Sequence, residues 1–444
     1  MEDQLNVDKR STGGESAGGP AMTNVSKRQS LIDDVARESY GKLLAWLSAR
    51  TGDVAAAEDA LSHAFEKACE QWPTNGAPSQ PEAWLMTVAK RRLIDLVRKK
   101  QTESAAADDI LRLIEERVTN AEQDMITHGK PFPDERLRLM LICAHPSIDP
   151  ETRTPLMLQT VLGLDAARIA SAFIVSDSSM AQRLVRAKRK IAAARIPFPQ
   201  LDSDEAIENL PAVLDAIYAS YTLGIDEGGS DRGDDLGKEA LYLAALASTL
   251  APHHAEGMGL HALLSFGEAR RDARWASERH SGTVGYIPFD HQDTALWDAS
   301  LVDGAEGLLK SAAQLFHTGR FQLEAAIQSA HMARRLKGQN TRSAVITLYR
   351  RLLDIAPSIG AQIGLAAALT ANGQPSDALD ELRKIEPRKA EQHQPFWATK
   401  AEADASLSNT ADALTSFDKA IALSTNESVK QFLQEKRQLA AASD

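Results

Sequence analysis

The residues best suited to contact a polyanion lie between Trp84 and Lys100, in a chain of 444 residues whose formal net charge is −11. This stretch, WLMTVAKRRLIDLVRKK, carries six Lys and Arg side chains from Lys90 onward, opposed only by Asp95. Lys and Arg displace the counterions of a nucleic acid, and a tryptophan face can stack on an unpaired base. A solvated basic helix behind a core tryptophan has the same composition. By itself, the stretch is therefore compatible with single-stranded DNA contact without establishing it.

A second basic run, residues 164–196, has the pattern of a helix-turn-helix. A short apolar helix precedes a turn at 173–175, and Ser176 is placed to cap the next helix by accepting an amide near Ser179. That next helix has one apolar stripe, formed by Met180, Leu184, Ala187 and Ile191. Its other face carries the side chains that could read duplex DNA: Ser178, Ser179, Gln182, Arg183, Arg186 and Lys190. The alternative is a basic surface helix with no ligand.

The elements that must position these side chains are helices. Apolar residues recur at three and four along nearly every segment, and the one stretch that could be extended is residues 282–288. We therefore predict an all-α fold. Charge is uneven along it, because residues 1–200 hold 27 Lys and Arg against 27 Asp and Glu, whereas residues 201–444 hold 23 against 34. A polyanion partner for the first half is thus compatible with the acidic total.

The chain divides into five predicted segments. These are a disordered tail (1–29), a helical domain (30–101), a linker (102–133), a helix-turn-helix domain (134–200) and a helical extension (205–444). Within the extension, residues 364–385 and 399–421 can be superimposed with an offset near 35. This period is typical of tetratricopeptide-like hairpins, which we place near 357–437. Stacked hairpins of this kind leave a surface for a possible protein partner.

No residues indicate catalysis, a cofactor or a metal site. Asp226 and Glu227, in a Gly-rich loop, fit a capped turn or a regulatory contact better than a pair of hydrolytic carboxylates. His253, His254 and His261 lack the companion ligands of a familiar zinc spacing. Two cysteines, which we expect to be buried thiols, and the absence of a secretory or membrane-spanning segment favour the cytoplasm.

The two basic runs together resemble a known family. Residues 57–73 and 81–100 are similar to the second conserved region of extracytoplasmic-function (ECF) sigma factors of bacterial RNA polymerase, and residues 169–191 are similar to the fourth region. Further similarity through residues 290–309 and 321–332 indicates the subgroup with a long helical extension that bears tetratricopeptide-like repeats. The resemblance covers roughly residues 30 to 435.

This resemblance implies a function and its residues. Glu58, Asp59 and Glu66 would contact the clamp coiled coil of the largest subunit of core RNA polymerase, and another contact would involve the flap of the second-largest subunit. The duplex-reading residues would contact the minus-thirty-five promoter element, and the extension would regulate the factor. The minus-ten element would be bound by Trp84, Lys90, Arg91, Arg92, Arg98 and Lys99. Many family members have Gly in the helix-turn-helix turn, where this chain has Ile174.

Two other functions stay open. A regulator could bind duplex DNA through the helix-turn-helix without joining polymerase, although the acidic helix around residues 57–72 argues against it. An adaptor could instead act mainly through its tetratricopeptide-like repeats.

Overall fold

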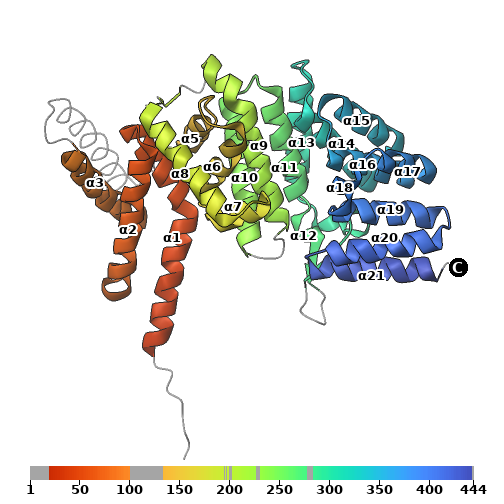
Figure 1. Ribbon diagram of the computed structural model, residues 1–444, viewed down its shortest axis with the longest axis horizontal. Coiled ribbons are helices and arrows are strands. Elements are labelled where there is room, and N and C mark those ends of the chain that lie inside the picture. Colours follow the sequence, from red (N-terminus) through yellow and green to blue (C-terminus); the bar gives the residue numbers. More distant parts are fainter. Residues whose placement is uncertain are drawn as a thin grey trace, which may run out of the picture. The chain divides into compact units, whose positions relative to one another are not determined.

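The computed structural model describes residues 20–100, 134–194, 196, 198–199, 203–226, 231–277 and 284–442 (Figure 1). Contacts between Cα atoms divide the chain into two compact units. The first comprises residues 1–136 and 192–195, and the second comprises residues 137–191 and 196–444.

Three helices make up the described part of the first unit: α1 (Pro20–Thr51), α2 (Val54–Asn75) and α3 (Pro81–Lys100). Each contacts the other two. A turn separates α1 from α2, since Gly52 adopts a φ of 66° and the Asp53 carboxylate accepts the amide of Ala56 at 3.0 Å. The core side chains come from all three helices: Leu43, Leu44, Trp46, Leu47, Leu61, Trp72, Leu85, Met86 and Leu93.

The predicted disordered tail, residues 1–29, extends too far along the chain. Helix α1 begins at Pro20, so residues 20–29 are helical. Proline is favoured at the first position of a helix, where its missing N–H leaves no bond unmade. The residues after Pro20 include no further glycine or proline that would interrupt a helix before the apolar pattern begins.

The second unit begins with four short helices: α5 (Arg136–Cys143), α6 (Pro150–Thr160), α7 (Ala166–Ala172) and α8 (Asp177–Ala194). Asp149 caps α6 by accepting the amide of Glu151 at 3.0 Å, and Asp165 caps α7 by accepting the amide of Arg168 at 2.8 Å. These caps fix where each helix starts.

Further helices continue this unit: α9 (Asp204–Asp226), α10 (Asp231–Leu250), α11 (Ala255–Glu268), α12 (Arg271–Arg274), α13 (Ala299–Ala313), α14 (Arg320–Lys337) and α15 (Arg342–Ile355). Between α12 and α13 lie strands β1 (Trp275–Ser277) and β2 (Val284–Tyr286) and 3-10 helices η1 (Phe289–His291) and η2 (Thr294–Leu296). The strands pair antiparallel, with Ala276 opposite Gly285. The all-α prediction is confirmed apart from this small hairpin, whose strand β2 lies in the stretch 282–288 that the sequence marked as the one that could be extended.

Helical hairpins end the chain: α16 (Ile359–Ala371) with α17 (Pro375–Arg383), and α19 (Gln394–Ser406) with α20 (Thr410–Leu423), along with the single helices α18 (Pro387–Glu391) and α21 (Glu427–Ala441). The first hairpin contacts the second through α17 and α19, and α15 contacts α16. Gly373 and Ser408, 35 residues apart, occupy the two hairpin turns with φ of 80° and 57°. The predicted repeat is therefore visible as a repeated helical hairpin, and its assignment as tetratricopeptide-like stays a prediction.

The two cysteines differ in their surroundings. Cys143 is buried, its Sγ lies 3.6 Å from the Thr160 hydroxyl, and burial raises the pKa of its thiol to about 12. Cys69 is exposed on α2, contrary to the sequence expectation, because it lies on the outer face of that helix. Of the described helices, none is long and apolar enough to cross a bilayer.

Candidate nucleic-acid interface

The helix-turn-helix predicted within residues 164–196 is present in the second unit. Helices α7 and α8 are joined by the turn 173–175, and the Ser176 hydroxyl accepts the amide of Ser179 at 3.3 Å. The side chains predicted to face the core are all buried: Ile169, Ala170, Met180, Leu184, Ala187 and Ile191. Burial of this stripe fixes the rotation of α8 about its axis and leaves its polar face accessible.

The six residues predicted to read duplex DNA share that polar face. Ser178, Gln182, Arg186 and Lys190 are exposed, and Ser179 and Arg183 are half-buried. Intramolecular contacts hold two of the arginines. A guanidinium nitrogen of Arg183 lies 3.8 Å from the Glu151 carboxylate of α6, and Arg186 donates to the Gln182 carbonyl at 3.3 Å. Because the Glu151 side chain is 84% exposed, this long ion pair is weak and leaves Arg183 available.

Two neighbouring basic residues on α8 have opposite surroundings. Arg189 is exposed beside the predicted set, although it was not assigned to it. Lys188, by contrast, is only 8% exposed. It follows Leu184 by four residues, and that spacing places it at the edge of the buried stripe. The basic residues of α8 therefore differ in their exposure to solvent. Their spacing from the apolar stripe predicts which of them are buried and which are exposed.

Ile174 adopts an unusual backbone conformation in the turn. Its φ is 53°, a left-handed conformation that disfavours β-branched side chains, and its side chain is 88% exposed. The neighbouring Phe173 has a φ of −96° and is 38% exposed. The turn thus keeps the geometry that glycine would adopt freely, with the strain concentrated at Ile174.

In the first unit, α3 carries the other predicted DNA-binding set. Arg91 is exposed, and Lys90, Arg92 and Trp84 are half-buried. The Trp84 ring meets the buried Trp72 ring edge-on, with centroids 5.5 Å apart. Trp84 therefore contributes to core packing and still exposes part of its surface, and its stacking on an unpaired base stays a prediction. The side chains of Arg98 and Lys99 lie outside the described residues, although their backbone belongs to the last turn of α3.

The acidic residues predicted to contact polymerase lie on α2. Asp59 and Glu66 are exposed, and Glu58 is half-buried. Asp59 accepts from the Arg92 guanidinium at 3.1 Å, so a residue predicted to dock polymerase pairs with one predicted to bind DNA. Glu66 lies 3.3 Å from Nδ1 of His63. The acidic and basic faces of this unit are therefore adjacent and electrostatically linked.

The helix-turn-helix shares its unit with the extension. Helix α6 packs against α9, and Nε2 of His145 lies 3.6 Å from the Glu205 carboxylate at the start of α9. The chain after α8 folds back as well, because Arg138 of α5 donates to the Pro199 carbonyl at 2.9 Å and lies over the Phe198 ring. The sequence showed a proline-rich boundary at this place, but not that the segments on its two sides pack together.

The histidines and carboxylates considered for other chemistry are His253, His254, His261, Asp226 and Glu227. In the described part of the chain, no group of three or more His, Cys, Asp or Glu residues could hold a metal ion. Burial lowers the pKa of His254 and of His261, which favours their neutral forms. Glu227 lies outside the described residues, as does the side chain of Asp226.

Comparison with known proteins supports the two-part organisation. The uncharacterized protein R00370 of Rhizobium meliloti (strain 1021) is 31% identical over 381 residues, which are 85% of this chain and 88% of that protein. This chain belongs to the same family. Residues 35–103 match sigma-70 region 2, and residues 209–313 match a family of unknown function, DUF6596. No solved structure matches.

This chain therefore combines a sigma-70 region 2 domain with a DUF6596 domain. The first of these holds α2 and α3, and with them the acidic and basic residues described above. A region 2 domain indicates a sigma factor, a class that binds core RNA polymerase and promoter DNA and has no catalytic activity of its own. The DUF6596 domain includes most of α9 and all of α10 to α13.

Proposed function

We propose that this protein is an ECF-type sigma factor that acts in the cytoplasm and carries a regulatory helical extension. It binds core RNA polymerase, recognises two promoter elements and helps to open the DNA near the start site. The observation that carries the proposal is the presence, in one chain, of a sigma-70 region 2 match and of a separate helix-turn-helix with an accessible basic face.

The first unit is proposed to bind polymerase and the minus-ten element. The exposed Asp59 and Glu66 of α2 suit an arginine-bearing surface such as the clamp coiled coil, and Glu58 lies beside them. The residues of α3 suit the backbone of an opened strand, where Lys and Arg neutralise phosphates. The Asp59–Arg92 pair would have to exchange partners on binding, which a surface ion pair does at little cost.

The second unit is proposed to read the minus-thirty-five element as duplex. The N-terminal residues of α8 suit the base edges, as in other helix-turn-helix proteins, and Arg186 and Lys190 suit the phosphates that follow. Arg183 is the candidate for bidentate base contact. The extension, with its excess of acidic residues, is proposed to regulate access to these faces, and its repeats are the proposed site of a protein partner.

Promoter-specific run-off transcription tests the proposal. The full chain, added to purified core polymerase, is expected to give a discrete transcript from promoters of its own genome. Arg183→Ala should weaken binding by about 1–3 kcal/mol and relax sequence choice at one promoter position. Arg388→Ala is the matched control, because Arg388 is exposed on α18 and outside the proposed interface. An equal loss on every sequence would reduce Arg183 to a phosphate contact.

Polymerase association is tested separately from DNA binding. Glu66→Lys should abolish capture by core polymerase, whereas Asp33→Lys, an exposed charge reversal on α1, should not. Asp59 is better replaced by Asn, because a lysine there would face Arg92 and confuse the two functions. If the chain bound promoter DNA but none of these variants or the parent bound polymerase, the protein would instead be a DNA-binding regulator.

A further inference from the structure

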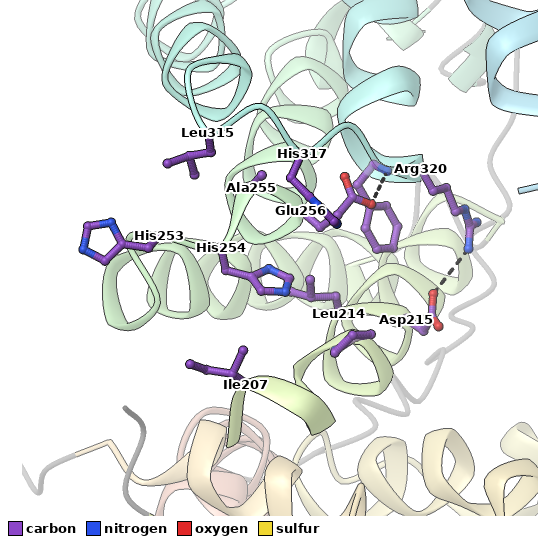
Figure 2. Close-up of a pocket in the computed structure, with 12 residues that line it drawn as sticks. Ile207, Leu214, Asp215, His253, His254, Ala255, Glu256, Leu315, His317 and Arg320 are labelled. Atoms are coloured by element: carbon purple, nitrogen blue, oxygen red, sulfur yellow. Dashed lines mark hydrogen bonds and ion pairs between the residues drawn. The ribbon is translucent and has the colours of Figure 1, made fainter. Parts of the chain in front are cut away.

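A hollow of about 700 Å³ lies in the second unit, between the start of α9, the turn before α11 and the turn before α14 (Figure 2). Half of its twelve lining residues are apolar, among them Ile207, Leu214, Leu315 and Phe321. Leu214 and Phe321 are buried, whereas Ile207 is 47% exposed. Such a volume and lining suit a small molecule with a hydrocarbon part.

Carboxylates outnumber cations around this hollow. Asp215 lies 3.3 Å from a guanidinium nitrogen of Arg320, which also donates to Glu324 at 2.8 Å. One guanidinium is therefore shared by two carboxylates. Asp215 and Glu256 are the two carboxylates that line the hollow (Figure 2), and Glu324 pairs with Arg320 from outside the lining. An anionic ligand would be repelled here, and a cation would be attracted.

The three carboxylates differ in how far they are already satisfied. Glu256 accepts the backbone amides of Phe321 and Gln322 at 2.8 and 3.0 Å, so it is committed to the first turn of α14. Glu324 is a direct partner of Arg320. Among the described residues, Asp215 has the longer contact to Arg320, and although its side chain is half-exposed, partial desolvation raises the pKa of its carboxyl group despite that cation. A second cation would therefore stabilise the ionised form of Asp215 more than that of the other two carboxylates.

His254, which lines the hollow, does not supply compensating charge. Nδ1 of His254 accepts the Gly257 amide at 3.2 Å, so in its neutral form this ring carries its proton on Nε2. Burial, and then the nearby His317, lower the pKa of His254, which keeps it neutral at pH 7. His254 can therefore donate one hydrogen bond to a ligand without repelling a cation.

We propose that this hollow binds a small organic amine. Its ammonium group lies against the Asp215 carboxylate, and its hydrocarbon part lies against the accessible apolar side chains Ile207 and Leu315. The hollow is formed by helices of the DUF6596 domain and the residues that follow it, so it would give this domain a ligand of its own. The proposal does not depend on a role in transcription.

Calorimetric titration of the full chain tests the proposal, with hexylamine, 2-phenylethylamine and tryptamine as cationic probes. Hexanoate and 3-phenylpropanoate are their anionic counterparts. At least one amine should bind, and the matching carboxylate should bind at least about tenfold more weakly. Asp215→Asn should weaken the amine by about tenfold or more. Asp303→Asn, which removes an exposed carboxylate from α13, should leave binding unchanged.

A second variant separates loss of the site from loss of the fold. Ile207→Trp places a larger side chain at the partly exposed edge of the hollow and should block the amine while the thermal midpoint is retained. Leu296→Trp, at an equally exposed residue of η2 outside the hollow, is its control. Failure of all three amines to bind, equal binding of the carboxylates, or unchanged binding to Asp215→Asn would overturn the proposal. Polymerase is absent from these titrations, so their outcome is independent of the proposed transcriptional function.

Discussion

Ile174 combines two properties that rarely coincide, a β-branched side chain and a left-handed backbone. The periodicity of the sequence predicted a turn at this position, and the resemblance to sigma factors pointed to glycine as the usual residue. The structure retains the turn and strains the isoleucine. Because the side chain is almost fully exposed, little packing compensates for the strain.

Ile174→Gly should therefore stabilise the protein. Relief of the left-handed strain is worth about 1–2 kcal/mol, from which the greater chain entropy of glycine subtracts about 0.5–1 kcal/mol. Urea unfolding followed by circular dichroism measures the net gain. Phe173→Gly, at a residue with an ordinary φ of −96°, should destabilise the protein instead. A loss of stability in both variants would contradict the account of the turn.

His331 makes a pH-dependent contribution to stability. Burial lowers its pKa from the ordinary value of 6.5 to about 4; nearby Arg334 and Arg270 act in the same direction and Asp290 opposes them. As the pH falls, the unfolded chain takes up this proton before the folded chain does. The stabilisation is therefore complete above about pH 6.5 and is lost as the pH falls toward about 4.

Replacing His331 by Gln should flatten this dependence. Unfolding free energies measured at about pH 7.5 and about pH 5 should differ less in His331→Gln than in the parent chain. His253→Gln, at an exposed histidine, serves as the control and should keep the parental difference. An unchanged difference in His331→Gln would assign the pH dependence to other groups.

Individual contacts were predictable from the sequence only where helical periodicity determines them. The buried stripe of α8 and the Ser176 cap follow from spacing along one helix. The Asp59–Arg92 pair does not, since the two residues are 33 apart and meet only because α2 and α3 cross as they do. Edge contact of Trp72 with Trp84 depends on the same crossing.

At the scale of elements, α14 shows a helix start that no local sequence pattern announces. Its first residue follows Gly319, which provides no capping side chain, and the carboxylate of Glu256 from α11 takes that role. The side chain that caps α14 therefore comes from a distant part of the chain, which the local sequence does not reveal. The repeat hairpins, in contrast, were visible because the same turn recurs after 35 residues, with Gly373 in one copy and Ser408 in the other.

Glu256→Gln should destabilise the second unit. Removing the charge weakens two hydrogen bonds to backbone amides, at a cost of about 1–2 kcal/mol. Hydrogen exchange should show faster exchange at the amides of Phe321 and Gln322, which lose their charged acceptor. Glu208→Gln, an exposed substitution on α9, controls for the change in net charge. Unaltered exchange at those two amides would contradict the capping role.

At the scale of the whole molecule, the division of the chain differs from the order of its motifs. The sequence indicated a boundary near residues 196–200, where prolines stop α8. The contacts instead join α5 to α8 with the extension, chiefly through α6 and α9. Long-range packing of this kind depends on surfaces that form only after the helices do, so periodicity and turn residues did not predict it.

Leu210→Ala tests whether this unit is energetically as well as spatially continuous. Leu210 is buried on α9, and its truncation should cost about 2–4 kcal/mol. If α8 unfolds together with α9, the amide of Leu184 should lose hydrogen-exchange protection by a similar amount. Leu407→Ala, at a residue 36% exposed beyond α19, should leave that amide unaffected. Protection retained in α8 would show that the two helices open independently.

The packing of α6 against α9 also bears on how such a protein can be cut or recombined. A chain cut at residue 200 would lose α9, and the surface of α6 that packs against α9 would be exposed to water. Such a shortened chain could aggregate or lose DNA affinity for reasons unrelated to regulation. Chimaeras that exchange extensions between relatives should therefore be joined ahead of α5, so that α5 to α8 stay together with the helices that support them.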